Sequence, residues 1–280
     1  MFKILAKKKL CPVVDFIKVD APAVAKKAKA GQFVVIRVDE VGERIPLTLA
    51  DWDQKEGTLS LVAMKVGTTT FKLSSFNTGD SILDLSGPLG IPSEIENYGT
   101  VVCVGGGVGV APVFPIARAL KQAGNKVISI MGARCQDLLF WEDRLRSVSD
   151  ELIVTTDDGS YGRKALVTEP LKEVLERDKG ISRVLAIGPA IMMKFCSSTT
   201  KPFGVKTIVS LNAVMVDGTG MCGCCRVSID GVTKFVCVNG PEFDGHLVDW
   251  DLLFKRQRIF CDEEKRSLDL WKERHGQTGE

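Results

Sequence analysis

The sequence predicts an antiparallel β-barrel, followed by a parallel doubly wound α/β domain and then a small cysteine-rich segment. Residues 1–97 contain short β-rich runs separated by glycine turns, which is typical of a small barrel. Residues 98–205 alternate between strand-like and helix-like patterns, which favours a parallel sheet. Residues 206–280 hold four of the nine cysteines within positions 222–237, so composition sets this end of the chain apart.

The runs in the first segment alternate partly between apolar and polar side chains, as half-buried strands do. We predict strands at residues 32–38, 59–64 and 81–85, with no long amphipathic helix between them. A small closed antiparallel barrel fits this spacing. The stretch at residues 87–92, Gly-Pro-Leu-Gly-Ile-Pro, predicts the loop by which the chain leaves the barrel.

The second segment carries apolar strand-like runs that alternate with helical patterns, and this alternation indicates a parallel doubly wound sheet. Its predicted strands lie at residues 101–104, 126–130, 151–155 and 183–187, and its predicted helices at 111–122, 138–146 and 167–177. The third segment predicts a strand at 207–211, a hairpin with arms at 225–229 and 234–238, a charged terminal helix, and a frayed tail at 276–280.

The composition excludes several classes of protein. The 280 residues suffice for two or three small domains, and 37 basic side chains balance 35 acidic ones, so nothing calls for nucleic acid as a partner. The longest apolar stretch, residues 101–117, is interrupted by four glycines and two prolines, which argues against a membrane helix. The N-terminus has no secretory pattern, so we expect a cytoplasmic protein.

A glycine-rich stretch, Gly-Gly-Gly-Val-Gly-Val-Ala-Pro, directly follows a predicted strand and precedes a predicted helix at residues 105–112. Glycines let the backbone approach a phosphate, and a helix N-terminus favours its negative charge. The alternative is a plain tight turn, but three consecutive glycines and a fourth are more than a turn requires. The spacing differs from the G-x-G-x-x-G fingerprint. The predicted nucleotide-binding residues are Gly106, Gly107, Val108, Gly109, Ala111 and Pro112.

The cysteine-rich turn fits a plant-type [2Fe–2S] site, C-x4-C-x2-C with a distant fourth ligand, if Asp217 takes the first position. Cys222 and Cys225 then fill the next two positions, and Cys237 is the distant ligand. Zinc bound by cysteine and carboxylate is the main alternative, and ordinary buried cysteines are the other. Cys224 falls outside the frame, next to the ligands. The scattered cysteines, which we expect to be buried small side chains, are Cys11, Cys103, Cys135, Cys196 and Cys261.

The glycine-rich stretch resembles the nucleotide loop of the ferredoxin–NADP reductase superfamily, in which a flavin-binding barrel precedes the nucleotide domain. The resemblance implies that Asp157 and Asp158, after the third strand, and Gly188, Pro189 and Met192, after the last, also contact the nucleotide. Gly188 and Pro189 would lie near the nicotinamide. Only Arg134 offers a cation soon after the strand at 126–130, which favours NAD(H) over NADP(H).

The resemblance also implies FAD in the barrel. Arg-Ile-Pro-Leu-Thr at residues 44–48 resembles the Arg-x-Tyr-Ser motif of the superfamily and the Arg-Arg-Pro-x-Ser motif of the dihydroorotate dehydrogenase electron-transfer subunit. Residues 65–70 look like its second flavin loop, with Thr69 in place of a usual glycine. The FAD-binding residues implied are Arg44, Pro46, Leu47, Thr48, Ala63, Met64, Lys65, Gly67, Thr69 and Thr70.

Nearly the whole chain resembles the dihydroorotate dehydrogenase electron-transfer subunit, including Cys-x-x-Gly-Pro-x-Phe at residues 237–243. Asp217, in place of that family's cysteine, and the continuation past Phe243 are similar to the small subunits of NADH-dependent reduced ferredoxin:NADP⁺ oxidoreductase, an electron-bifurcating flavoenzyme. This resemblance implies FAD, a [2Fe–2S] cluster and NAD(H) on this chain, with no catalytic acid or base. It also implies a larger partner subunit with a flavin and [4Fe–4S] clusters, through which ferredoxin and NADP(H) react.

Three alternatives remain open at this point. The chain could serve a dihydroorotate dehydrogenase or a sulfide dehydrogenase with the same chemistry. It could be a self-contained flavin reductase, although a cluster with no downstream acceptor would then be idle. It could also be a zinc-stabilised nucleotide-binding protein without redox turnover.

Overall fold

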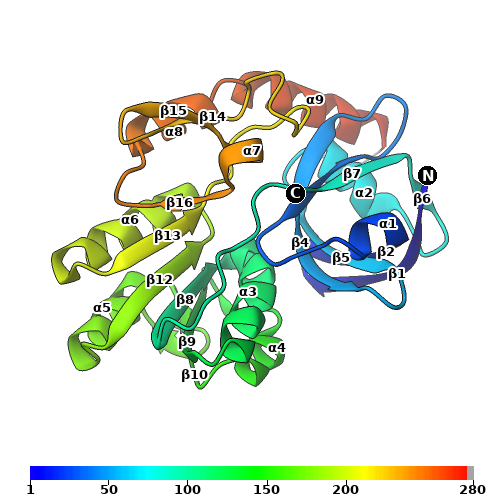
Figure 1. Cartoon of the computed structure of the whole chain (residues 1–280). Helices are drawn as coiled ribbons and strands as arrows, with labels where there is room; N and C mark the ends of the chain where they lie inside the picture. Colours follow the sequence, from blue (N-terminus) through cyan, green and yellow to red (C-terminus); the bar gives the residue numbers. More distant parts are fainter. Residues whose placement is uncertain (276–280) are drawn as a thin grey trace.

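The structure is a computed structural model and describes residues 1–275. It contains a barrel, an α/β domain and a C-terminal segment that crosses the top of both in Figure 1. The first sheet has the order β6-β1-β2-β5-β4-β3-β7. Its strands are all antiparallel: β1 (Phe2–Cys11), β2 (Val14–Asp20), β3 (Phe33–Arg37), β4 (Arg44–Asp53), β5 (Thr58–Met64), β6 (Ser81–Ile82) and β7 (Asp84–Leu89). Because the two outer strands β6 and β7 are separated only by Leu83, the sheet curls into a nearly closed barrel.

The predicted barrel is confirmed, but the sequence pattern missed three of its strands. β1 and β2 were not predicted, and a run of lysines on β1 hides its alternation. β4 was also missed, although it carries residues 44–48. The predicted strand at 81–85 is two strands, and residues 87–89 of the expected exit loop continue β7 along β3. Two short helices complete the barrel, α1 (Pro22–Ala25) and α2 (Thr68–Ser75).

The second sheet has the order β11-β10-β9-β8-β12-β13-β16. The strands are β8 (Thr100–Gly106), β9 (Lys126–Ala133), β10 (Glu151–Thr156), β11 (Arg163–Lys164), β12 (Ile181–Ile187), β13 (Lys206–Ser210) and β16 (Glu242–Asp244), and only β16 runs antiparallel to its neighbour. From β8 the chain adds β9, β10 and β11 in turn on one side, and then β12, β13 and β16 on the other side. The strand order therefore reverses between β8 and β12, which is where ligands bind in such sheets.

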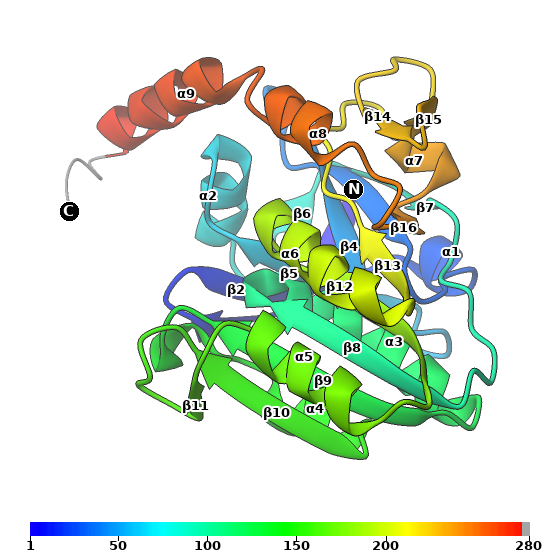
Figure 2. The same ribbon diagram turned by 90° about the vertical axis from the view of Figure 1, so that its left-hand side faces the viewer.

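Helices cover both faces of this sheet, as predicted (Figure 2). α3 (Val110–Gln122) and α4 (Glu142–Ser147) pack on the face toward the barrel, and α5 (Thr168–Arg177) and α6 (Ala190–Thr200) pack on the other. The predicted helix at 138–146 is wrong in its first half. Residues 136–138 form a 3₁₀ turn, and Trp141 has a left-handed backbone with φ of 62°, so α4 begins only at Glu142.

The C-terminal segment contains β14 (Arg226–Ile229), β15 (Val232–Phe235), α7 (Val236–Asn239), α8 (Trp250–Gln257) and α9 (Cys261–Arg274). The second arm of the predicted hairpin is shifted, because Asp230 and Gly231 form a two-residue turn with positive φ at both positions. Cys237 therefore lies on α7 rather than on a strand. The predicted single terminal helix is two helices, and the predicted tail at 276–280 lies outside the described residues.

The C-terminal segment is bound to both other parts of the molecule. β16 pairs with β13 and so completes the second sheet. At the barrel, Thr68 Oγ1 of α2 lies 2.8 Å from Ser267 Oγ of α9, and the rings of Phe71 and Trp271 lie 5.7 Å apart. Among the described residues, no helix is long and apolar enough to cross a membrane.

Candidate nucleotide, flavin and iron–sulfur sites

The glycine-rich loop ends β8 and begins α3, as the sequence predicts. Gly107 has φ of +55°, and no atom lies within 4 Å of the position that a Cβ would take. The backbone is therefore open on this side, at the N-terminus of a helix of 13 residues. Such a helix end attracts an anion, so this geometry suits a phosphate group.

The loops after β8 and β12 lie directly against each other. A Cβ on Gly109 would lie 2.2 Å from the carbonyl oxygen of Ile187, and one on Gly106 would lie 2.2 Å from Met192 Sδ. A Cβ on Gly188 would lie 2.9 Å from the carbonyl oxygen of Gly106. The structure thus brings the predicted residues of these two loops together, at the reversal of strand order, and glycine is required for their close approach.

The loops after β9 and β10 are also joined. Asp158 N donates to the Arg134 carbonyl at 3.2 Å, and Asp157 N donates to the Ala133 carbonyl at 3.0 Å. The Asp158 carboxylate accepts bonds from the side chain and backbone of Ser160, which hold the pKa of Asp158 below its usual value. Asp158 thus shapes this turn, while Arg134 and Asp157 are exposed at the same edge of the sheet.

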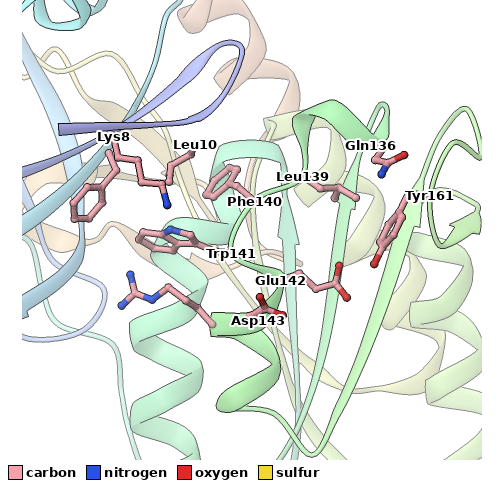
Figure 3. A pocket seen from close by; sticks show the side chains of 11 residues that line it. Lys8, Leu10, Gln136, Leu139, Phe140, Trp141, Glu142, Asp143 and Tyr161 are labelled. Atoms are coloured by element: carbon pink, nitrogen blue, oxygen red, sulfur yellow. The ribbon is translucent and has the colours of Figure 1, made fainter.

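Beside these loops lies a cavity of about 750 Å³ that the sequence analysis missed. Figure 3 shows Lys8 and Trp141 at one end of it and Gln136 and Tyr161 at the other. Its lining residues come from the β1–β2 hairpin, from the loops after β9 and β10, and from the start of α4: Lys8, Leu10, Phe16, Gln136, Leu139, Phe140, Trp141, Glu142, Asp143, Arg144 and Tyr161. None of the predicted site residues lines it, since the cavity depends on contact between the barrel and the α/β domain. The adjacent aromatic residues Phe140 and Trp141, which line the cavity, were the one feature of the sequence that could have pointed to it.

The cavity wall is held by aromatic packing and by an ion-pair cluster. The Trp141 ring lies edge-on to those of Phe16 and Phe114, at 6.3 and 5.9 Å. Arg144 lies over the Trp141 ring at 4.2 Å and also pairs with Asp51 of β4. Asp143 also lines the cavity, and within residues 1–275 it forms no ion pair, whereas its neighbour Glu142 pairs with exposed Arg146 at 2.6 Å.

The predicted flavin residues occupy neighbouring strands of the barrel. Residues 44–48 begin β4, where Pro46 pairs with Val35 and Thr48 pairs with Phe33 of β3. β5, the other neighbour of β4, ends at Met64 and touches the 107–109 turn of the nucleotide loop. The two predicted flavin motifs therefore belong to neighbouring strands, and the strand that leads into the second touches the nucleotide loop.

The second flavin motif leads into the N-terminus of α2. No atom lies within 4 Å of a Cβ position on Gly67, so this helix start is open. Thr70 Oγ1 accepts bonds from the backbone amides of Val66 and Gly67 at 3.0 and 3.1 Å. The Thr70 hydroxyl thus closes the turn, while the open glycine and the helix start form a suitable cradle for a phosphate.

Two of the predicted cluster ligands are buried together. Cys225 Sγ and Cys237 Sγ lie 3.2 Å apart, and each residue is 2% exposed. Burial and the neighbouring Cys225 thiol raise the pKa of Cys237 to about 12. The Cys237 thiol becomes a thiolate only beside a strong positive charge, and bound iron would supply that charge. The residues therefore fit a metal cluster.

Asp217 and Cys222 lie on an exposed loop that leads to this pair. The Asp217 carboxylate accepts bonds from the amides of Thr219 and Cys222 at 2.7 and 3.0 Å, which lower the pKa of Asp217 and keep it ionised. In residues 1–275 no three His, Cys, Asp or Glu side chains are close enough to hold a single metal ion. Asp217 thus has a role in shaping the loop, and its role as a ligand stays a prediction.

The loop from Asp217 to Cys225, which we call the cluster loop, packs on the barrel at Gly218. Its φ is +78°, and a Cβ there would lie 2.8 Å from Val35 Cγ2 and 2.9 Å from Leu89 Cδ1. Val35 is the strand partner of Pro46 in the predicted flavin motif. The loop that carries the predicted cluster ligands is therefore seated on the strand next to the one that carries the predicted flavin motif.

Comparison with known proteins identifies the family. The sequence profile of the iron–sulfur cluster binding domain of dihydroorotate dehydrogenase B matches residues 212–249, and that of the oxidoreductase NAD-binding domain matches residues 103–198. A Thermotoga maritima protein described as a dihydroorotate dehydrogenase B (NAD⁺) electron transfer subunit homolog is 50% identical, over 99% of this chain and 97% of its own length. The chain belongs to the family of dihydroorotate dehydrogenase B electron-transfer subunits. A member from Desulforamulus reducens is 32% identical, over 89% of this chain and 97% of its own length.

Solved structures agree with this family and with the predicted fold. One from a study of flavin-based electron bifurcation by the NADH-dependent reduced ferredoxin–NADP oxidoreductase is 50% identical, with a TM-score of 0.92, over 97% of this chain and 98% of that chain. A ferredoxin NADP⁺ reductase from Neisseria gonorrhoeae is 20% identical, with a TM-score of 0.60, over 72% of this chain and 90% of that chain. The second likeness shows the fold alone, that of the ferredoxin–NADP reductases.

Membership of this family confirms the predicted oxidoreductase subunit with NAD-binding and iron–sulfur domains. The scattered cysteines are only partly as predicted. Cys11, Cys103 and Cys196 are buried, whereas Cys135 is half-buried and Cys261 is exposed. Cys261 is exposed because it begins the largely solvated helix α9.

Proposed function

We propose that this chain is the small subunit of an electron-bifurcating NADH-dependent reduced ferredoxin:NADP⁺ oxidoreductase. In this role it passes electrons between NAD(H), FAD and a [2Fe–2S] cluster, and then to a larger partner subunit. The contact of Gly218 with Val35 and Leu89 carries the proposal, because it seats the cluster loop on the flavin barrel. Electron transfer between the two groups needs this proximity.

The residues divide the work between binding and positioning. When bound, FAD exchanges a hydride with NADH and single electrons with the cluster. Arg44 and the start of α2 at Gly67 hold the flavin pyrophosphate, and Thr48 offers its hydroxyl to the isoalloxazine edge. Gly106 and Gly109, with the open Gly107 between them, let the nucleotide phosphates approach the backbone. Of the remaining predicted residues, Gly188, Pro189 and Met192 border the nicotinamide, and Asp217, Cys222, Cys225 and Cys237 hold the cluster.

The cavity beside the loops after β9 and β10 supports NAD(H) as the dinucleotide. It lies at the edge of the sheet where Arg134 and Asp157 are exposed, so a nucleotide that crosses the glycine-rich loop can place its adenosine end there. Glu142 and Asp143 line the cavity, and carboxylates accept ribose hydroxyls but repel a 2′-phosphate. Its two cations are Lys8 and the Asp51-paired Arg144.

The second candidate is the electron-transfer subunit of a dihydroorotate dehydrogenase, and the family name favours it. Two features favour the bifurcating enzyme. Asp217 stands where that subunit has cysteine, and the chain continues past the match at 212–249 into α8 and α9. The Thermotoga maritima relative and the bifurcation structure both span this continuation, since they cover 99% and 97% of the chain.

The test is to purify the chain from its native host with whatever subunit co-purifies and to assay the complex. The proposal predicts a larger flavin and iron–sulfur partner, and NADP⁺ reduction by NADH that depends on reduced ferredoxin. Dihydroorotate oxidation by the same complex would instead establish the second candidate. A chain that purifies colourless with stoichiometric zinc would contradict both.

A further inference from the structure

Helix α8 is fixed against the chain on both sides of the cluster loop. At its start, the Asp249 carboxylate accepts a bond from Leu252 N at 2.9 Å, while Asp249 N donates to the Ser228 carbonyl of β14 at 3.0 Å. At its end, Gln257 Nε2 donates to the backbone and side-chain oxygens of Asn212 at 3.1 and 2.9 Å. Asn212 precedes the loop and Ser228 follows it, so α8 has a defined position relative to the cluster ligands.

This position directs one arginine at the cluster loop. Arg256 Nη2 donates to the carbonyl oxygen of Cys224 at 2.9 Å, between the predicted ligands Cys222 and Cys225. Arg256 is half-buried, and within residues 1–275 no carboxylate forms an ion pair with it. Its charge is therefore aimed at the loop and is not neutralised by a neighbouring acid.

A second guanidinium approaches the same loop more loosely. Arg226 Nη1 lies 3.5 Å from the carbonyl oxygen of Gly223, and Arg226 is exposed. Solvent screens an exposed charge more than a half-buried one, so Arg256 exerts the larger effect on the loop.

Reduction of the cluster adds one electron, and thus one negative charge, without making or breaking a bond. A positive charge held nearby stabilises this reduced form more than the oxidised form, and net charge and hydrogen bonding are among the factors that set iron–sulfur potentials. A cation on the cluster loop therefore raises the reduction potential.

We infer that Arg256 is a positioning residue that fixes the Cys224 segment of the cluster loop and raises the reduction potential of the cluster. This inference rests on the proposed function, because it requires the cluster at Cys222, Cys225 and Cys237. Arg256 lies outside the stretch matched by the iron–sulfur profile, residues 212–249. Its effect makes the cluster a better acceptor of single electrons.

The test compares R256Q with K255Q in the purified, cluster-bearing chain. Lys255 is exposed on the same helix one residue away, so both variants remove one positive charge, but only R256Q removes the contact with Cys224. The midpoint potential of the cluster is measured by redox titration followed by EPR. At a fixed potential near the midpoint, the ratio of oxidised to reduced cluster should rise about tenfold in R256Q, or about 59 mV for a one-electron couple. In K255Q it should change less than about twofold.

R256K keeps the charge but loses the forked geometry, so its potential should lie between those of the wild-type chain and R256Q. Equal shifts in R256Q and K255Q, or no shift in either, would overturn the inference. So would an R256Q chain that melts like the wild type but holds no iron, because Arg256 would then act on loading and not on potential. A wild-type chain with no [2Fe–2S] signal would instead overturn the proposed function, and this inference with it.

Discussion

Replacing Gly107 with alanine separates ligand binding from folding at the nucleotide loop. In the free chain nothing lies within 4 Å of the Cβ that the substitution would add, so it creates no clash. Its cost is the left-handed backbone, because Gly107 has φ of +55°. Alanine in this region costs about 1 to 2 kcal/mol, of which restriction of the unfolded chain offsets about 0.5 kcal/mol.

Gly204 provides a matched control for this substitution. It has φ of +67° and equally open surroundings, but it follows α6 and its 3₁₀ turn and lies away from the nucleotide loop. Both G107A and G204A should therefore lose about 1 kcal/mol of stability, which lowers the melting temperature by about 3 °C. Only G107A places a methyl group where a phosphate must approach the backbone, and it should weaken NADH binding at least tenfold, or about 1.4 kcal/mol.

The assay is a titration of each purified variant with NADH, together with thermal melting. Gly109→Ala serves as a contrast, since its Cβ would lie 2.2 Å from the Ile187 carbonyl oxygen and it should lose several kcal/mol of stability. If G107A binds NADH as tightly as G204A does, the phosphates do not approach the loop at this residue and the reasoning is refuted.

Three further predictions concern the cluster, the C-terminal helix and a half-buried acid. Asp217→Ala should change the EPR spectrum of the reduced cluster or lower its iron content; an unchanged spectrum with full iron would remove Asp217 from the ligands. Trp271→Ala removes a ring that is 7% exposed and packed on α2, so it should cost about 3 kcal/mol and speed the release of FAD, whereas L270A, at a residue 45% exposed, should do neither. Glu242 is held against Ser93 at 2.5 Å, and burial raises its pKa from 4.5 to about 7. The folded chain therefore binds the proton more tightly than the unfolded chain does. The free energy of unfolding should fall by at most about 3 kcal/mol as the pH rises from 4.5 to 7, and Glu242→Gln should remove this dependence in melts at several pH values.

Features that depend on a few neighbouring residues were predictable from sequence. The glycine-rich turn and its flanking strand and helix were found because the glycines and apolar runs are contiguous. Cys225 and Cys237, which the expected frame makes ligands, lie close together, even though Cys237 lies on α7 and not on a strand; their role as ligands stays a prediction. The Asp230-Gly231 turn, which fixes the start of β15, was a local signal that the predicted hairpin boundaries overlooked.

Features that depend on distant contacts were not predictable in this way. The cavity unites Lys8 of β1 with Tyr161 of the α/β domain, and no local pattern links two such residues. β1 was missed because Lys7, Lys8 and Lys9 interrupt the apolar alternation of a strand whose buried residues are Ile4 and Cys11. The approach of Arg256 to Cys224 depends on how α8 folds back over the loop, which the spacing of the cysteines does not contain.

Anaerobic EPR of the purified chain before and after addition of NADH tests whether this chain carries electrons from NADH through FAD to the cluster. We predict that the oxidised chain is silent, and that NADH reduces the flavin and brings up the signal of a reduced [2Fe–2S] cluster, with iron and FAD both bound to the chain. A chain that gives no such signal even with a strong chemical reductant, or whose cluster is reduced by that reductant but never by NADH, would contradict it.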